Sequence, residues 1–125
     1  MRNILILCAA ILLVGAAALV WYSTRPQHFG TPFRGAPKAA VKDLLDKPAE
    51  HLGRDVAVEG NIIRQCPATG CWLYLKDDSG KDIRVEMNSI APHFPQRVGR
   101  KALVEGQLAK VGDHYEIEGK AVEFK

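Results

Sequence analysis

Val104-Glu105-Gly106-Gln107-Leu108 decides the fold, and it echoes Val58-Glu59-Gly60-Asn61-Ile62 earlier in the chain. In both stretches apolar residues alternate with polar ones, which is the period of a half-buried β-strand. Each stretch has a glycine in its middle, where a strand usually bulges or bends sharply. Two long strands bent in this way are what a small closed sheet needs to turn its corners.

Three further segments have the alternation of strands: Trp72 to Lys76, Asp82 to Met87 and His114 to Phe124. Residues 89–98 lie between the third and fourth strands, and two prolines break their pattern, so we expect a loop with at most one helical turn. Five strands with an irregular third connection predict an all-β fold, a five-stranded OB-fold barrel. A short helix over residues 41–52 is expected before it, with a break near Pro48.

The chain divides into three parts of different composition. Ile4 to Tyr22 is an apolar run without charge, and a helix of this length matches the hydrocarbon thickness of a bilayer. A cleaved signal peptide is the alternative, but the aromatic pair Trp21 and Tyr22 favours a retained anchor. We expect a transmembrane signal anchor over 1–22, a Pro/Gly-rich tether over 23–40 and the barrel domain over 41–125.

The net charge of +3 is concentrated in the tether and its junction with the barrel. Residues 24–54 carry six Lys or Arg against three acids, whereas residues 55–125 carry ten against eleven. A near-neutral domain lacks the basic footprint of a nucleic-acid binder, so no nucleic-acid partner is expected.

Several short motifs together suggest a relationship: Cys66-x3-Gly70-Cys71-Trp72, Lys76-Asp77-Asp78-x-Gly80, Arg84-Val85 and Val104-Glu105-Gly106. This set resembles an uncharacterised family of small exported bacterial OB-fold domains, over about Val41 to Phe124. The resemblance implies the fold and an extracytoplasmic compartment rather than an activity.

The chain is more distantly similar to the periplasmic haem chaperone of cytochrome c maturation, which is also a membrane-anchored OB-fold. In that family the haem-attaching His precedes a Tyr by four residues. Here Tyr115 follows His114 directly and the fourth residue is Glu118, so covalent haem attachment is not supported.

Cys66 and Cys71 flank a four-residue turn, and three chemistries are open to them. Opposed across an antiparallel pair, they are within reach of a disulfide that would staple a small exported domain. A redox-active thiol needs a depressed pKa, and the sequence shows neither a Cys-x-x-Cys spacing nor a helix start beside them. We therefore favour the structural disulfide.

The third chemistry is a metal site that uses both thiolates. Soft ligands of this kind suit Cu(I) or Zn(II), and such a site needs three or four ligands. Its candidate ligands are Cys66, Cys71, His93, His114 and Met87. Each histidine is otherwise a surface residue, and Met87 is otherwise a core residue.

The alternation also places Trp72, Tyr74 and Lys76 on one face of a strand, with Arg84 on the next. This is the usual ligand face of an OB-fold. No Ser-His-Asp set, phosphate loop or carboxylate pair is identifiable, so we expect no catalytic activity.

We expect a single-pass protein of the bacterial cytoplasmic membrane, with its C-terminal domain in the periplasm or outside. Its expected role is protein binding through Trp72, Tyr74, Lys76 and Arg84, as an accessory subunit or assembly factor of an envelope complex. The alternative is a metal or haem carrier that uses Cys66 and Cys71. A weaker alternative is an oligonucleotide-binding OB-fold.

Overall fold

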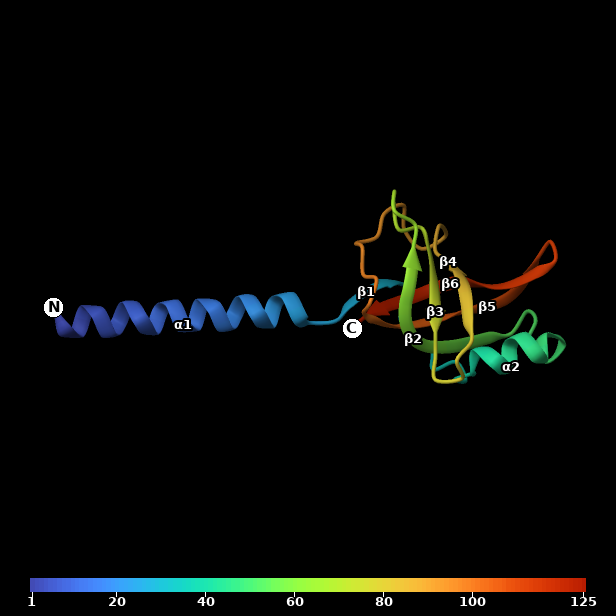
Figure 1. The fold of residues 1–125 in the computed structure, drawn as a ribbon, viewed down its shortest axis with the longest axis horizontal. Coiled ribbons are helices and arrows are strands. Elements are labelled where there is room, and N and C mark those ends of the chain that lie inside the picture. Colours follow the sequence, from blue (N-terminus) through green and yellow to red (C-terminus); the bar gives the residue numbers. More distant parts are fainter.

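A computed structural model of the chain describes residues 1–125, and Figure 1 shows a small barrel joined to one long helix. The strands of the barrel are β2 (Asp55–Gln65), β3 (Trp72–Lys76), β4 (Asp82–Glu86), β5 (Lys101–Val111) and β6 (His114–Phe124). The remaining elements are α1 (Arg2–Thr24), β1 (Gln27–Gly30), α2 (Val41–Asp46) and the 3-10 turn η1 (Pro48–Glu50).

The five barrel strands close into a ring in the order β2-β3-β4-β6-β5, and β5 pairs with β2 again. Every neighbouring pair in this ring is antiparallel except β4 and β6, which run parallel. This is the closed five-stranded arrangement of an OB-fold, so the predicted fold class is confirmed.

The two predicted strand bends lie at Gly60 and Gly106. The pairing of β5 with β6 shifts register between Glu105 and Gly106, and β2 passes from β5 to β3 at Asn61. A Cβ atom on Gly60 would lie 2.6 Å from the carbonyl oxygen of Lys76, and one on Gly106 would overlap the carbonyl oxygen of Glu118. Only glycine lets the neighbouring backbones approach this closely.

The core fills the barrel with alternate side chains of its strands. Leu73 and Leu75 are fully buried on β3, and Met87 is fully buried just beyond β4. The short helix ends at Asp46 and a 3-10 turn follows, as Pro48 predicted. The predicted helix range of 41–52 was too long, because Leu52 lies after the 3-10 turn and is 40% exposed.

The segment 23–40 is more ordered than its prolines and glycines indicate. Residues 27–30 form β1, which pairs antiparallel with the end of β6. The ring of Phe29 packs edge-on against Phe94 and Phe124, with centroids 5.2 and 5.7 Å away. The segment is thereby attached to the barrel before α2 begins.

The buried carboxylate of Glu105 holds the next part of the same segment. It accepts hydrogen bonds from the backbone N–H groups of Arg34, at 2.8 Å, and Ala36, at 3.2 Å. Two residues later the backbone of Lys38 forms an isolated bridge with Ala57 of β2. The path from α1 to α2 therefore runs along the barrel wall.

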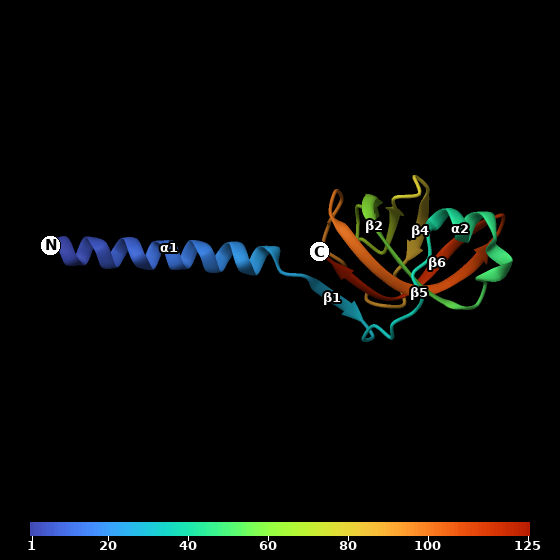
Figure 2. The same cartoon turned by 90° about the horizontal axis from the view of Figure 1, so that it is seen from below.

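The helix α1 is long and apolar enough to cross a membrane, and it packs against nothing in the barrel. Figures 1 and 2 show it extending straight away from one end of the barrel. The C-terminus lies at that same end in both views, whereas α2 lies at the opposite end.

Candidate functional site

The outer face of β2, β3 and β4 carries two aromatic and two cationic side chains that contact one another. We call it the aromatic–arginine face, and it consists of Arg64, Trp72, Tyr74 and Arg84. Tyr74 on β3 has Arg64 and Arg84 as its neighbours on the adjoining strands, so the four side chains share one outer surface.

These four side chains stack on one another. The Trp72 and Tyr74 rings meet edge-to-face with centroids 5.7 Å apart. The Arg64 guanidinium lies 5.1 Å from the Tyr74 ring centroid and 5.9 Å from that of Trp72, and the Arg84 guanidinium lies 5.3 Å from that of Trp72. Cation–π contacts at exposed sites are worth about 0.5–1 kcal/mol each, so the stack holds the rings and guanidinium groups in place.

The two arginines differ in their charge partners. Arg84 forms ion pairs with Glu86, at 3.1 Å, and with Glu116, at 3.4 Å. Partial burial disfavours the charge of Arg84, but these carboxylates outweigh it and raise the pKa of Arg84 above its usual value. Arg64 forms no ion pair within the chain and is exposed, so it is the cation available to a partner.

The structure places three of the four predicted binding residues together. Lys76 lies on the same face of β3, beside Asn61 and Asp82, but it makes no cation–π contact with either ring. Arg64 was not predicted as a member of the face. A bulge in β2 between Ile62 and Arg64 changes the alternation, and strict period-two reading does not detect it.

The surface hollows of the protein lie elsewhere. The largest, of about 480 Å³, is open and lies between residues 37–39 and residues 50–56. No residue of the aromatic–arginine face lines any hollow on the surface. The face is therefore a sheet surface rather than a pocket, and its shape suits a protein segment better than a small molecule.

The turn between β2 and β3 carries two of the three cysteines, and the predicted disulfide is not formed. Cys66 and Cys71 are free, half-buried thiols. The amide of Cys66 donates to the carbonyl of Trp72, at 3.0 Å, and Gly70 closes the turn by donating to the carbonyl of Cys66, also at 3.0 Å. Cys71 is thus offset by one residue from the cross-strand position that the sequence analysis gave it.

The turn supplies hydrogen-bond donors that can stabilise a thiolate, which the sequence did not predict. Backbone N–H groups of Thr69 and Ala68 donate to the Cys66 sulfur, and Cys71 adds further hydrogen bonds. These donors lower the pKa of Cys66 to about 6 from its ordinary value near 9. The donors come from a hairpin turn, a source that the search for a helix start did not include.

The five predicted metal ligands do not come together. Met87 donates its amide to the Cys71 carbonyl, at 2.8 Å, but its side chain is buried in the core. His114 lies at the start of β6, 3.7 Å from Glu116, and His93 is exposed on the loop that follows β4. No three His, Cys, Asp or Glu side chains form a group that could hold a metal ion.

No protein-family model matches this chain, and no curated protein matches it significantly. The candidate sites therefore rest on the geometry of the chain itself.

Proposed function

We propose that this protein is a membrane-anchored module that binds another protein through the aromatic–arginine face. One observation carries the proposal: two aromatic rings and an unpaired arginine are stacked together on an uncovered outer sheet face. Trp, Tyr and Arg are the residue types that dominate the binding energy of protein interfaces. On this proposal the chain is an accessory subunit or assembly factor of an envelope complex.

The charge pattern of the face favours a partner that presents a carboxylate. Arg64 has its guanidinium above two rings and lacks an acidic neighbour, whereas Arg84 is already paired with two glutamates. An acidic side chain of a partner would complete the pairing of Arg64, and the rings would cover apolar parts of the same partner segment.

The helix α1 is the proposed anchor. Its last turn contains Trp21 and Tyr22, and the Arg25 guanidinium lies 5.9 and 4.9 Å from their ring centroids. Aromatic and cationic residues of this kind favour the interface between membrane and water. On this proposal α1 crosses the cytoplasmic membrane and the barrel stands outside the cytoplasm.

Site-specific photo-crosslinking in native membranes tests the binding face. A photoreactive phenylalanine analogue in place of Tyr74 is expected to yield one adduct of defined mass. Tyr115 is the matched control position, because it is also a half-buried tyrosine with a cation, Lys110, 6.0 Å from its ring centroid. It lies on β6, outside the face, and is expected to yield no adduct.

Two arginine substitutions sharpen this test. Arg64→Ala is expected to lower the yield of the Tyr74 adduct about tenfold, which corresponds to a loss of about 1.4 kcal/mol of binding. Arg54→Ala removes an exposed arginine outside the face and is expected to leave the yield unchanged. Equal adducts at Tyr74 and Tyr115, or no adduct at Tyr74, would rule out the proposed binding face.

A further inference from the structure

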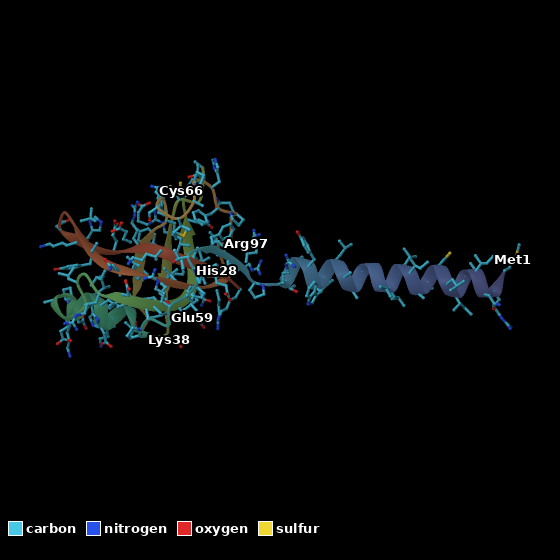
Figure 3. The ribbon with its side chains drawn as sticks, turned by 180° about the vertical axis from the view of Figure 1, so that it is seen from behind. Met1, His28, Lys38, Glu59, Cys66 and Arg97 are labelled. Carbon is cyan, nitrogen blue, oxygen red and sulfur yellow. The ribbon has the colours of Figure 1, made fainter.

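The turn between β2 and β3 brings two thiols into one short loop that is fixed from outside. Phe94 donates its amide to the Thr69 carbonyl at 2.8 Å, and Gln96 donates its side-chain amide to the Cys66 carbonyl at 2.8 Å. Figure 3 shows Cys66 at the edge of the barrel, away from the core. The loop after β4 therefore fixes the turn while both cysteines stay partly exposed.

A buried glutamine keeps this loop in place. Gln65 donates to the Pro95 carbonyl at 2.9 Å and accepts from the Arg97 amide at 2.8 Å. Gly70 adopts φ +70° directly beneath Phe94, where a Cβ atom would lie 2.9 Å from a backbone oxygen. The N–H donors around Cys66 are thus positioned before any reaction occurs, which is the condition for stabilising a negative charge efficiently.

We propose that Cys66 and Cys71 form a redox-active dithiol that exchanges with external disulfides, with Cys66 as the attacking sulfur and Cys71 as the resolving one. Both thiols belong to the same short turn, which Gly70 closes by donating its amide to the Cys66 carbonyl. This activity is separate from binding at the aromatic–arginine face, and it is tested without a protein partner.

The exchange has two steps. The Cys66 thiolate attacks one sulfur of the external disulfide, a Cys66–sulfur bond forms, and the other sulfur leaves as a thiolate that takes a proton from water. Cys71 then gives up its proton and attacks the Cys66 sulfur, which releases the second external sulfur as a thiolate. The external disulfide gains two electrons, and the dithiol loses them and becomes the Cys66–Cys71 disulfide.

The surroundings of Cys66 distinguish this dithiol from a structural disulfide. Hydrogen-bond donors that stabilise the Cys66 thiolate stabilise the reduced state of the pair. They do not stabilise the oxidised state, because a disulfide sulfur carries no negative charge. A disulfide formed here is consequently easy to reduce, whereas a structural disulfide of an exported protein resists reduction by glutathione. The attacking thiol also has a pKa close to ambient pH, which is the optimum for exchange.

The experiment uses the full chain in detergent, with Cys8→Ser to remove the third thiol. With Cys71→Ser in addition, oxidised glutathione is expected to add one glutathionyl group to Cys66 and to stop there. With both cysteines present, the adduct is transient and the end product has lost two hydrogen atoms by mass spectrometry. An excess of reduced glutathione is expected to return the end product to the dithiol.

A matched pair of variants tests the role of the turn. Thr69→Pro removes one N–H donor, and the rate of Cys66 modification at pH 6 is expected to fall about fivefold, because a pKa that rises by about one unit from about 6 lowers the thiolate fraction from about one half to about one tenth. Thr69→Ala keeps that N–H and is expected to react at the original rate. Circular dichroism of both variants confirms that the barrel is intact.

Three results would overturn the dithiol. One is a Cys66 that reacts with oxidised glutathione no faster than Cys71 does in the Cys66→Ser variant. Another is a Cys66–Cys71 disulfide that reduced glutathione does not open. The third is an equal rate for the folded Thr69→Pro and Thr69→Ala chains; if Thr69→Pro does not fold, the first two results decide the question.

Discussion

At the residue scale, the two Val-Glu-Gly stretches show how one motif serves two purposes. Their glycines do the same work, since each makes room for a neighbouring carbonyl oxygen. Their glutamates differ, because Glu105 is 7% exposed and accepts two backbone hydrogen bonds, whereas Glu59 lies near the surface and pairs with Lys125 at 3.0 Å. The repeat predicted the bends, but nothing in it distinguishes these two carboxylates.

The two glutamates therefore make a matched pair for mutation. Glu105→Ala is expected to lower the free energy of unfolding by about 2 kcal/mol, because it leaves two backbone N–H groups without their charged acceptor. Glu59→Ala removes an exposed ion pair and is expected to cost less than about 1 kcal/mol. Urea denaturation monitored by tryptophan fluorescence measures both values, and equal costs would contradict the anchoring role of Glu105.

The Cys66 thiol makes the stability of the reduced protein depend on pH. Its pKa is about 6 in the folded chain and near 9 ordinarily, so between these values the unfolded chain binds more protons. Stability from this thiolate is complete above pH 9 and is lost as the pH falls through 6. The free energy of unfolding should therefore rise with pH more steeply across this window for the reduced protein than for Cys66→Ser. Parallel slopes in denaturation series under reductant would contradict this.

At the element scale, the sequence predicted the barrel strands well because each buries one face and exposes the other. The clearest case is β3, where Leu73 and Leu75 are buried in the core and Trp72 and Tyr74 lie on the outer face. The strand β1 was missed because its four residues, Gln27–Gly30, are too few to show a clear alternation. Its place depends on pairing with β6 and on aromatic contacts that only the folded chain provides.

Phe29 should therefore behave as a core residue although it lies in a proline-rich tether. Phe29→Ala is expected to lower the free energy of unfolding by about 2 kcal/mol, somewhat less than for a fully buried phenylalanine. His28→Ala, at the neighbouring exposed position, is expected to change it by less than about 0.5 kcal/mol. Thermal unfolding of the two variants provides the comparison, and an unaffected Phe29→Ala would show that β1 adds nothing to the barrel.

The candidate sites were less predictable than the strands. Trp72, Tyr74 and Arg84 followed from alternation, but Arg64 depends on a bulge and the Cys66 donors depend on the shape of a turn. Backbone groups carry no sequence signature, so a thiol activated by them cannot be recognised from residue types alone.

At the scale of the whole molecule, the proposed anchor gives a prediction about orientation. The charges near the helix do not decide its orientation, because Arg2 lies at the start of α1 and Arg25 directly after its end. We expect the short N-terminal region to stay in the cytoplasm, so a phosphatase that folds only outside the cytoplasm should be active when fused after Lys125. Fluorescence from a reporter that folds only in the cytoplasm would instead place the barrel inside.

The pairing of Gln27 with Phe124 makes the first and last strands of the domain direct neighbours. The place where the chain enters the barrel and the place where it leaves are therefore almost the same point, on the side facing α1. The order in which the chain connects the strands can accordingly be changed without changing the orientation of the barrel. A membrane helix attached after Lys125 would present the barrel to its surroundings in the same way as one that precedes Gln27, and a circular permutant opened at the Gly112 turn would keep every strand pair.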